Sequence, residues 1–300
     1  MITIVNSDDL IQSDLLVIGS GLAGLSFSLK AAPAGSIALV TKQDIRESST
    51  RYAQGGIAAV TTEEDSFQSH ISDTLTAGDG LCREDVVELV VENAPAMIRR
   101  LVDLGVSFTR RRKNREQFDL GREGGHSERR VLHADDQTGA EIEDCLAGAV
   151  QKEKRVAVFE NHIAVNLIVT PDGNGENRCR GAYVLDHRTG QVKKFLAHTT
   201  ILASGGAAKV YLYTSNPDTA AGDGVAMAYR AGARIANMEF MQFHPTCLYH
   251  PEAKSFLISE AVRGEGGILK TSEGEPFMER YHPLKSLAPR DITARAIDKE

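Results

Sequence analysis

The first forty residues place two short apolar runs around a segment with helical spacing. Residues 14–18 (DLLVI) and 36–40 (SIALV) are bounded by polar residues and glycine, which is typical of buried strands. Residues 22–32 (LAGLSFSLKAA) have helical periodicity that ends at Pro33. A strand, a helix and a second strand form the repeating unit of a parallel sheet.

Further helices are predicted over 65–77, 84–104 and 139–151. Gly105 is well placed to end the longest one, and Pro95 should kink it. Seven apolar residues of that helix share one face and should be buried: Val87, Val90, Val91, Ala94, Met97, Ile98 and Leu101.

Alternating apolar and polar positions then predict a run of strands, at 156–160, 162–170, 181–186 and 192–196. The turn-rich stretches PDGNGEN and HRTG separate three of them, so we expect an antiparallel sheet inserted into the parallel domain. A buried strand at 201–206 (ILASGG) and a helix at 223–231 follow.

The last sixty residues change character, with connections rich in aromatic residues, histidine and proline. We therefore predict a boundary near residue 237, with domains at 1–237 and 238–300. The chain stops at ARAIDKE within a helical pattern, so we expect it to be part of a longer protein.

Composition excludes several classes of function. The formal charge of −7 disfavours binding to nucleic acid. The basic run at 110–113 lacks interleaved aromatic residues, which indicates a solvated loop. Steering of anionic substrates or a partner is the alternative. Four scattered cysteines form no C-x-x-C pair, which argues against a metal site or disulfides and suits the cytoplasm. The N-terminus has no signal-peptide pattern, and no apolar run is long enough to span a membrane.

A glycine-rich turn joins the first predicted strand to its helix. It fits G-x-G-x-x-G with Gly19, Ser20, Gly21, Leu22, Ala23 and Gly24. In this context the first glycine forms a tight turn, the second lets the backbone approach a pyrophosphate, and the third lets helix and strand pack closely. A turn that serves packing alone is the alternative.

The usual fingerprint continues with an acid at the end of the second strand, but Thr41 and Lys42 stand there. A ribose must therefore be held by a hydroxyl, the backbone or an ammonium group. This difference weakens the case for NAD as the main ligand.

The polar stretch SSTRYAQGG lies after the second strand, at the edge of the sheet where such folds bind ligands. Its hydroxyl and amide groups can bind a flavin ring or pyrophosphate, and its glycines let the main chain approach the ring. The candidate contacts are Ser49, Thr50, Arg51, Tyr52, Ala53, Gln54, Gly55 and Gly56. A capped helix start is the alternative.

Eight ordered motifs resemble the fumarate reductase/succinate dehydrogenase flavoprotein family, and within it the members that oxidise L-aspartate. The motifs are G-S-G-L-A-G, S-T-x-Y-A-Q-G-G-I-A, R-E-G-G-H-S, A-S-G-G, G-D-G, F-H-P-T, R-G-E-G and A-P-R-D. The resemblance covers nearly the whole chain, although family members are longer. It implies an α/β fold: a Rossmann-type FAD-binding domain with a parallel sheet and an antiparallel insertion, followed by the start of an α+β capping domain.

FAD is the implied cofactor, with further contacts from Ala203, Gly205 and Asp223. In the membrane-associated members of the family, a histidine four residues before A-Q-G-G bonds covalently to FAD. Ser49 stands there in this chain and cannot form that bond, so we expect non-covalent FAD.

Within R-E-G-G-H-S, Glu123 stands where the resemblance implies an apolar residue in dicarboxylate reductases. An acid suits a substrate with an ammonium group, such as L-aspartate, whereas succinate has none. Cations and neutral donors must hold the two substrate carboxylates. The candidates for substrate binding are Glu123, His244, Thr246, Ser259, Glu260, Arg263 and Arg290, of which Arg290, His244 and Glu123 are the candidates for catalysis.

The implied reaction transfers hydride from Cα of L-aspartate to flavin N5 and gives iminosuccinate, with oxygen or fumarate as electron acceptor. It is the first step of NAD synthesis from aspartate, and the implied next enzyme is quinolinate synthase. The resemblance makes Arg290 the acid/base residue, yet a guanidinium stays protonated. We therefore expect Arg290 mainly to clamp a carboxylate.

Other interpretations stay open. Taken singly, His244 is more typical of a structural turn, and Glu123 is more typical of an ordinary loop carboxylate. Arg290 and Asp223 could each cap a helix. The protein could be a soluble fumarate reductase or succinate dehydrogenase flavoprotein instead. The segment alone could also be an inactive fragment that binds part of FAD.

Overall fold

The computed structural model describes residues 6–7 and 9–300, so the predicted absence of a signal peptide rests partly on residues outside that range. The described chain forms two compact units, of residues 1–52 with 142–240 and of residues 53–141 with 241–300. The division at residue 240 falls near the predicted boundary at residue 237. Residues 53–141, however, belong to the same unit as residues 241–300. The functions assigned to the two predicted domains stay predictions.

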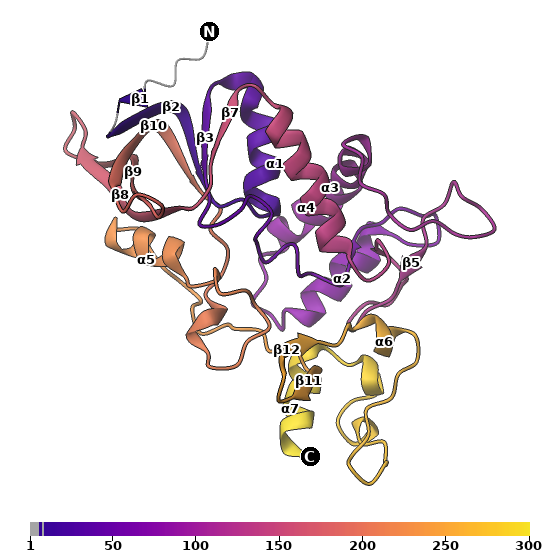
Figure 1. The fold of residues 1–300 in the computed structure, drawn as a ribbon. Coiled ribbons are helices and arrows are strands. Elements are labelled where there is room, and N and C mark those ends of the chain that lie inside the picture. The colour runs from indigo at the N-terminus through magenta and orange to yellow at the C-terminus, as the bar shows by residue number, and fades with distance from the viewer. Residues whose placement is uncertain (1–5, 8) are drawn as a thin grey trace. The chain divides into compact units, whose positions relative to one another are not determined.

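The first unit is built on one large sheet with strand order β7-β3-β2-β10-β9-β8, and β1 pairs with β2 (Figure 1). Its strands are β1 (Asn6–Ser7), β2 (Leu10–Ile18), β3 (Ile37–Val40), β7 (Val156–Phe159), β8 (His162–Pro171), β9 (Asn177–Asp186) and β10 (Val192–Leu202). The pairs β2–β3, β3–β7 and β2–β10 are parallel, whereas β1–β2, β10–β9 and β9–β8 are antiparallel. The predicted parallel core and antiparallel extension are confirmed as parts of this one sheet.

Two details of the strand prediction are wrong. The run at 156–160 belongs to the parallel part, because β7 lies beside β3. The runs at 192–196 and 201–206 are not two strands with a gap between them, since β10 runs without a break from Val192 to Leu202. The antiparallel strands β9 and β8 continue the sheet of the parallel part, because β10 pairs with β2 on one side and β9 on the other.

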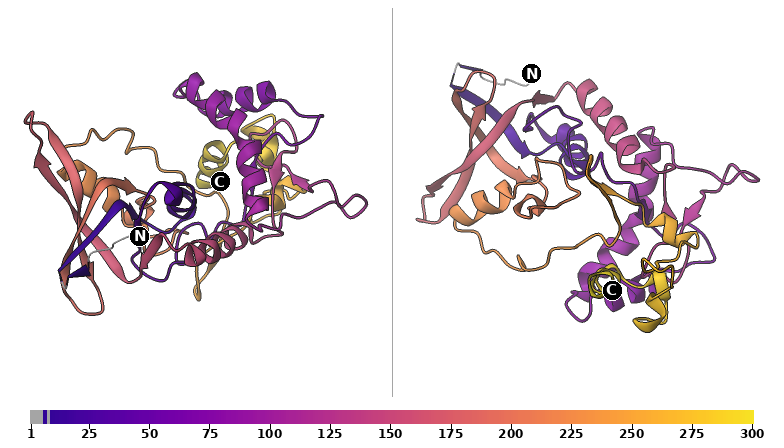
Figure 2. Two further views of the ribbon diagram at one scale, coloured as in Figure 1. Left: turned by 90° about the horizontal axis from the view of Figure 1, so that it is seen from above. Right: turned by 60° about the horizontal axis from the view of Figure 1, so that its bottom comes forward.

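Helices cover the sheet of the first unit. Helix α1 (Leu22–Ala31) packs against β2 and β3, and α5 (Asp223–Arg230) lies beside β8 (Figure 2). A short 3-10 turn, η1 (Ala32–Ala34), follows α1 and contains the proline that was predicted to end it. The apolar cluster of this unit contains Ile11, Leu16, Ile18, Ala38, Val40, Ala164, Ala182, Val184, Phe195 and Met227.

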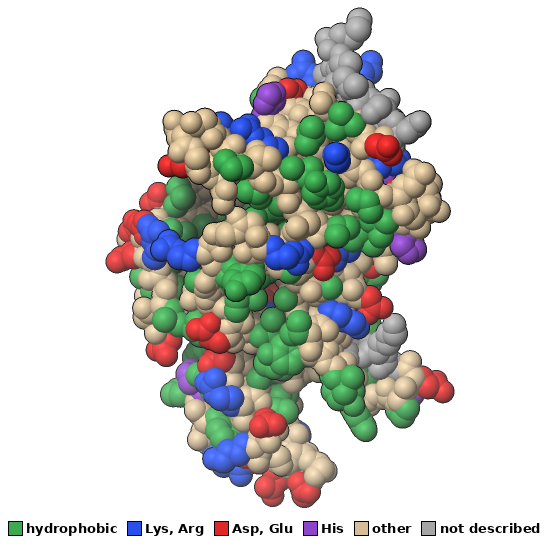
Figure 3. All heavy atoms as spheres, turned by 90° about the vertical axis from the view of Figure 1, so that its left-hand side faces the viewer, with side chains coloured by type: hydrophobic (Ala, Val, Ile, Leu, Met, Phe, Trp, Pro, Cys, Tyr) green, Lys and Arg blue, Asp and Glu red, His purple; other side chains and the backbone are tan. Residues whose placement is uncertain are grey.

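The segment after β10 contributes little to this core. It contains η2 (Ala208–Val210). Shortly after η2, the side chains of Leu212 and Tyr213 are 85% and 83% exposed. The face shown in Figure 3 carries other hydrophobic side chains at the surface among charged ones.

The second unit combines helices with two small sheets. Its remaining elements are β4 (Ile57–Ala58), α2 (Phe67–Ala77), α3 (Glu84–Asp103), β5 (Leu120–Gly121), β6 (Val131–Leu132), β11 (Cys247–His250), β12 (Ala253–Leu257), α6 (Ala261–Gly264), η3 (Met278–Arg280), η4 (Lys285–Leu287) and α7 (Arg290–Lys299). Strands β4, β6 and β5 form one antiparallel sheet, and β11 and β12 form another. Helix α4 (Thr138–Lys152) begins in this unit's segment and continues into the first unit's.

The helix predicted over 84–104 is present as α3, but the predicted apolar face is partly wrong. Val87, Val91 and Ile98 are buried, whereas Val90 and Met97 are 63% and 47% exposed. Of the buried residues, Val87 and Val91 pack with Ile71 of α2, so the contact with α2 covers a narrower stripe than the sequence suggested. No helix in the described part of the chain is both long enough and apolar enough to cross a membrane.

Candidate functional site

In the glycine turn between β2 and α1, two of the glycines are required by close backbone contacts within the protein. Gly19 has φ +113°, and a Cβ on it would collide with the carbonyl oxygen of Ala203. A Cβ on Gly24 would collide with the carbonyl oxygen of Gly19. These two positions therefore need glycine for the fold itself, in agreement with the tight turn and the close helix packing predicted for them.

Gly21 is different, because nothing in the first unit requires glycine there. Its φ is −69°, and the nearest atom to an added Cβ is Thr50 Oγ1 at 3.4 Å. Thr50 Oγ1 accepts a hydrogen bond from the Leu22 backbone N–H at 3.0 Å, while Gly21 provides no side-chain cap and the first turn of α1 contains no acid. A helix N-terminus of this kind suits an approaching phosphate, so the residues fit the pyrophosphate of FAD.

The carboxyl end of β3 carries a hydroxyl group and a lysine where the usual fingerprint has an acid. Ser20 Oγ and Thr41 Oγ1 lie 2.8 Å apart, and both residues are buried. Lys42 Nζ forms an ion pair with Asp223 Oδ2 at 2.5 Å and donates to the Thr219 carbonyl at 2.7 Å. The structure thus brings together two predicted cofactor residues, Lys42 and Asp223, which are far apart in the sequence.

Residues 49–52 follow in the same unit. Arg51 Nη1 binds Asp144 Oδ1 at 3.0 Å, and the Tyr52 hydroxyl donates to the Glu47 carboxylate at 2.9 and 3.0 Å. These two side chains already have protein partners. A direct contact with FAD from either side chain stays a prediction.

Two further cofactor candidates lie in loops of the first unit. Ser49 Oγ is 3.5 Å from Asn216 Oδ1, a weak contact that leaves the hydroxyl partly exposed. Gly205 has φ +72°, which favours glycine. Their roles toward FAD also stay predictions.

Glu143 on α4 is a residue that sequence reasoning missed. It is fully buried, and burial raises the pKa of its carboxyl to about 7, against the opposing effects of Ser48 and Arg51. Glu143 belongs to no motif. The signal in the sequence is an acid within the apolar stripe of a predicted helix, a position where burial raises a carboxyl pKa.

The rest of the polar stretch belongs to the second unit. The Ala53 carbonyl accepts a hydrogen bond from Gly139 N–H at 2.9 Å, and a Cβ on Gly56 would collide with the Leu132 carbonyl. Gln54 Oε1 is buried and has no hydrogen-bond partner among the described residues. Because a buried acceptor needs a donor, Gln54 fits a ring N–H of a flavin.

A cluster of charged side chains forms the centre of the second unit's candidate site. Arg290, the first residue of α7, donates from Nε to Glu260 Oε2 and from Nη1 to Gln242 Oε1 at 2.9 Å. Its Nη2 lies 3.6 Å from Glu123 Oε2. Gln242 was not predicted, although it lies two residues before His244, in the segment that carries F-H-P-T. Arg290 is thus oriented by three side chains.

Glu260 connects this cluster to a second arginine. Its Oε1 lies 3.3 Å from Arg263 Nη2 and accepts a hydrogen bond from Gly124 N–H at 2.9 Å. Arg263 Nη1 donates to the Ser286 carbonyl at 2.8 Å, and both the Glu260 and the Arg263 side chain are only 3% exposed. Glu260 therefore forms ion pairs with two guanidinium groups, and direct substrate contact by Arg263 stays a prediction.

Two titratable groups of the cluster have shifted pKa values. Burial, followed by the nearby Glu260 carboxylate, raises the pKa of Glu123, and Arg290 opposes that shift. Burial and the Arg290 guanidinium lower the pKa of His244. At neutral pH His244 is therefore uncharged, so Arg290 is the main cation available to a ligand carboxylate.

His244 is held in place by Thr246. Its Nδ1 lies 2.9 Å from the Thr246 carbonyl oxygen, and its Nε2 is buried with no hydrogen-bond partner in the part of the chain that the structure describes. Thr246 Oγ1 donates to the Ile258 carbonyl at 3.2 Å, and Ser259 Oγ accepts from Ala261 N–H at 3.3 Å. His244 Nε2 can thus serve a ligand, whereas the two hydroxyl groups have internal partners.

Comparison with known proteins identifies the family. The FAD binding domain profile matches residues 14–300. The chain belongs to the FAD-binding domain family. This membership confirms the predicted α/β fold, the resemblance to the fumarate reductase/succinate dehydrogenase flavoproteins, and FAD as the cofactor.

The chain is also similar to named members of that family. It is 52% identical over 295 residues to an L-aspartate oxidase of Pseudomonas aeruginosa, covering 96% of this chain and 55% of that protein. An L-aspartate oxidase of Nicotiana tabacum is 47% identical, with 96% and 45% covered. The chain thus spans about half the length of the curated relatives it matches.

Among solved structures, the fold is similar to that of a mutant of the E. coli quinol fumarate reductase FrdA. The TM-score is 0.89 at 32% identity, and the match covers 97% of this chain and 51% of that one. A flavocytochrome c3 fumarate reductase in an open conformation gives a TM-score of 0.76 at 28% identity, with 96% and 51% covered.

Proposed function

We propose that the protein, in its complete form, oxidises L-aspartate to iminosuccinate with FAD as the cofactor. The observation that carries this proposal is the pairing of Glu123 with Arg290, a carboxylate and a guanidinium 3.6 Å apart in one cluster. An α-amino acid presents an ammonium and a carboxylate on neighbouring atoms, so this pair offers one charge for each. The similarity to L-aspartate oxidases supports the same substrate.

The residues of this chain bind and orient the substrate. Arg290, whose guanidinium is oriented by Glu260 and Gln242, clamps one substrate carboxylate. Glu123 receives the ammonium group, and His244 Nε2 provides a neutral hydrogen bond. When bound, FAD supplies the redox chemistry by accepting hydride from Cα of the substrate.

Proton transfer follows the charges of these residues. The substrate ammonium must lose its proton, and Glu123 is the better acceptor because its pKa is raised. Arg290 stays protonated and polarises the carboxylate in the aspartate reaction. Proton donation by Arg290 suits the reduction of fumarate, in which carbon must gain a proton.

We propose non-covalent binding of FAD, supported by Ser49 at the position of the linking histidine. Acid precipitation should release all of the flavin into the supernatant, as measured by its absorbance. Flavin retained on the precipitated polypeptide contradicts this proposal.

The further biological context rests on the family resemblance. Oxygen or fumarate reoxidises the flavin, quinolinate synthase consumes the product on the route to NAD, and the compartment is the cytoplasm. None of the four cysteines forms a disulfide in the described part of the chain, which suits a reducing compartment.

The test uses FAD-loaded protein expressed from the complete gene and mixed with L-aspartate in the absence of oxygen. We expect loss of the yellow flavin absorption and the formation of iminosuccinate. The second candidate, a soluble fumarate reductase, is favoured by the structural similarity to FrdA. It is the correct one if aspartate leaves the flavin oxidised while a low-potential donor drives fumarate reduction.

A further inference from the structure

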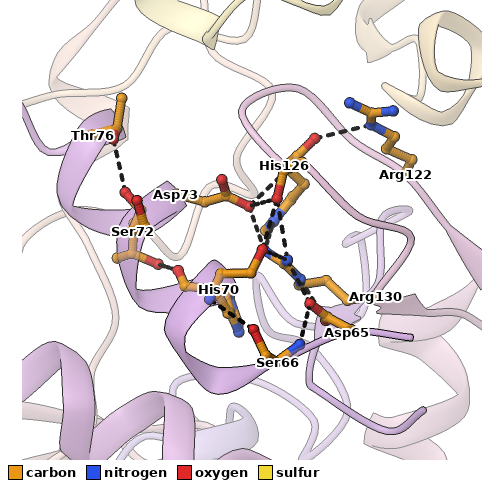
Figure 4. A network of polar contacts seen from close by, with 12 residues as sticks. Asp65, Ser66, His70, Ser72, Asp73, Thr76, Arg122, His126 and Arg130 are labelled. Atoms are coloured by element: carbon orange, nitrogen blue, oxygen red, sulfur yellow. Dashed lines mark hydrogen bonds and ion pairs between the residues drawn. The ribbon is translucent and has the colours of Figure 1, made fainter. Parts of the chain in front are cut away.

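A buried ion-pair network lies next to the turn that carries Glu123 (Figure 4). At its centre, Arg130 is fully buried and binds Asp65 with two hydrogen bonds, Nε to Oδ2 and Nη2 to Oδ1, each 2.8 Å long. Its Nη1 also donates to Asp73 Oδ2 at 2.5 Å. One guanidinium therefore holds two carboxylates, one of them on helix α2.

The same carboxylate holds the end of the turn. Both the backbone N–H and the hydroxyl of Ser127 donate to Asp73 Oδ2 at 2.8 Å. Ser69 adds a bridge, because its Oγ lies 2.9 Å from both Ser127 Oγ and Arg130 Nη2. The position of Ser127 thus depends on where Arg130 places Asp73.

Within the turn, the position of Ser127 is coupled to that of Glu123. Arg122 Nε donates to the His126 carbonyl at 2.9 Å, and His126 N–H donates to the Glu123 carbonyl at 3.3 Å. On the other side, Gly124 N–H binds Glu260 at 2.9 Å. Residues 122–127 therefore connect the ion-pair network directly to the proposed substrate site.

The charges in the network favour a fixed arrangement. Burial and the Arg130 guanidinium lower the pKa of both His70 and His126, so neither ring competes with Arg130 for the two carboxylates at neutral pH. A buried ion pair often adds little to stability compared with apolar residues of the same size. The geometry that such a pair imposes is a better explanation for its presence here.

We propose that Arg130, through Asp73 and Ser127, is a positioning residue that sets the location of the Glu123 carboxylate and thereby the recognition of the substrate ammonium. This inference rests on the proposed function, in which Glu123 binds that group. Arg130 does not itself touch the substrate. It acts through the turn 122–127.

The experiment measures Arg130→Lys in the FAD-loaded protein from the complete gene. Lysine keeps the charge but cannot bind Asp65 with two parallel hydrogen bonds. We expect the KM for L-aspartate to rise about tenfold, because a displacement of about 1 Å in a positioned group costs up to about 100-fold. The inhibition constant of succinate, which has no ammonium group, should change by less than about twofold.

A double-mutant comparison separates positioning from general damage. In a Glu123→Gln background, Arg130→Lys should raise the KM for aspartate little further, since the group it positions is already altered. A full additional tenfold rise overturns the inference, as does an equal loss for aspartate and succinate. Arg129→Lys is the matched control, because Arg129 is the exposed neighbour that binds Glu265 at 3.1 Å, and it should behave as wild type.

A second variant and a second readout keep the test independent of folding and of the proposed function. Asp73→Asn keeps an acceptor for Ser127 N–H and removes the charge that links Arg130 to the turn, while Asp65 still holds Arg130, so it should reproduce the loss selective for aspartate. Amide hydrogen exchange across 122–127 should be faster in both variants than in wild type, and unchanged exchange overturns the inference. Wild-type protein that fails to oxidise aspartate overturns the proposed function alone, because the exchange measurement still tests the positioning.

Discussion

Two buried glutamates, one in each compact unit, differ in whether a positive charge lies beside the carboxylate. Glu143 in the first unit is buried, and burial raises its pKa to about 7 against the opposing effects of Ser48, Arg51 and Arg46. Glu260 in the second unit is nearly as buried but forms ion pairs with Arg263 and Arg290. Desolvation dominates in the first case, whereas opposite charges compensate it in the second.

The difference extends to the ligands that each unit suits. The first unit offers backbone groups and a helix N-terminus at Gly21, which bind a phosphate without a fixed side-chain charge. The second unit offers a guanidinium and carboxylates that restrain one another, a suitable arrangement for a small zwitterion. The proposed nucleotide site and the proposed amino-acid site thus rely on different physical interactions.

The largest expected effect concerns the cation of the second unit. Arg290→Ala should lower kcat/KM for L-aspartate about 1000-fold, because the substrate carboxylate loses its charged partner, Glu123 loses its cation and Glu260 keeps only Arg263. Steady-state kinetics on the FAD-loaded protein measure this loss. Arg295→Ala removes an exposed arginine of the same helix and should change activity less than about twofold. Similar losses in both variants contradict a specific role for Arg290.

The second prediction concerns Glu143. An unfolded glutamate titrates near 4.5 and the folded one near 7, so the folded protein retains a proton between these values and loses stability as the pH rises through this window. Glu143→Gln should remove this loss and be more stable than wild type by up to about 3 kcal/mol at pH 8, with little difference at pH 4.

Denaturant unfolding across this pH range checks the prediction. Glu88→Gln, on the exposed surface of α3, serves as the control and should show the pH profile of wild type. A Glu143→Gln profile that runs parallel to wild type shows that the buried carboxyl is not the source of the pH dependence.

The third prediction tests the anion of the second unit. Glu123→Gln should lower kcat/KM for L-aspartate about 30-fold and leave fumarate reduction within about threefold, because only aspartate has an ammonium group. The two activities are measured on the same preparation. Glu265→Gln changes an exposed acid and is the control. Equal losses in both reactions remove the basis for ammonium binding by Glu123.

The smallest expected effect lies in the first unit. Gly21→Ala should weaken FAD binding about tenfold, because the methyl group occupies the space open to the pyrophosphate, while the apoprotein keeps its melting temperature. Flavin fluorescence titration and thermal melting give the two quantities. Gly148→Ala on α4 also has open space around it and should leave FAD affinity unchanged. A destabilised Gly21→Ala apoprotein instead indicates a role in the fold.

The contrast between the units also explains what the sequence could predict. The glycine motif lies within a few positions of the chain, so its spacing was sufficient to predict the strand, the helix and the tight turn at Gly19. The close approach of Gly19 to the Ala203 carbonyl came only from the structure. The charged cluster joins Glu123 to residues more than a hundred positions away. Periodicity carries no such information, and only the family resemblance linked those residues before the structure did.

The errors have related causes. The polar residues near the middle of β10 suggested a gap, but pairing with β2 extends the strand through them, which is a tertiary effect. Helix α3 has more apolar residues than its neighbours cover, so Val90 and Met97 remain exposed. Arg130 and Glu143 belong to no motif, and their significance follows from burial and, for Arg130, from its ion pairs with Asp65 and Asp73.

The pairing of β2 with β10 has a consequence for synthesis of the protein. Leu10 pairs with Lys194, so the central strand of the sheet has an unsatisfied edge until roughly 180 further residues have left the ribosome. At ~5–20 residues per second this takes roughly 10–35 s. Throughout that interval the apolar strands β2 and β3 of the nascent chain are open to unintended partners, which makes early binding by a chaperone valuable to this protein.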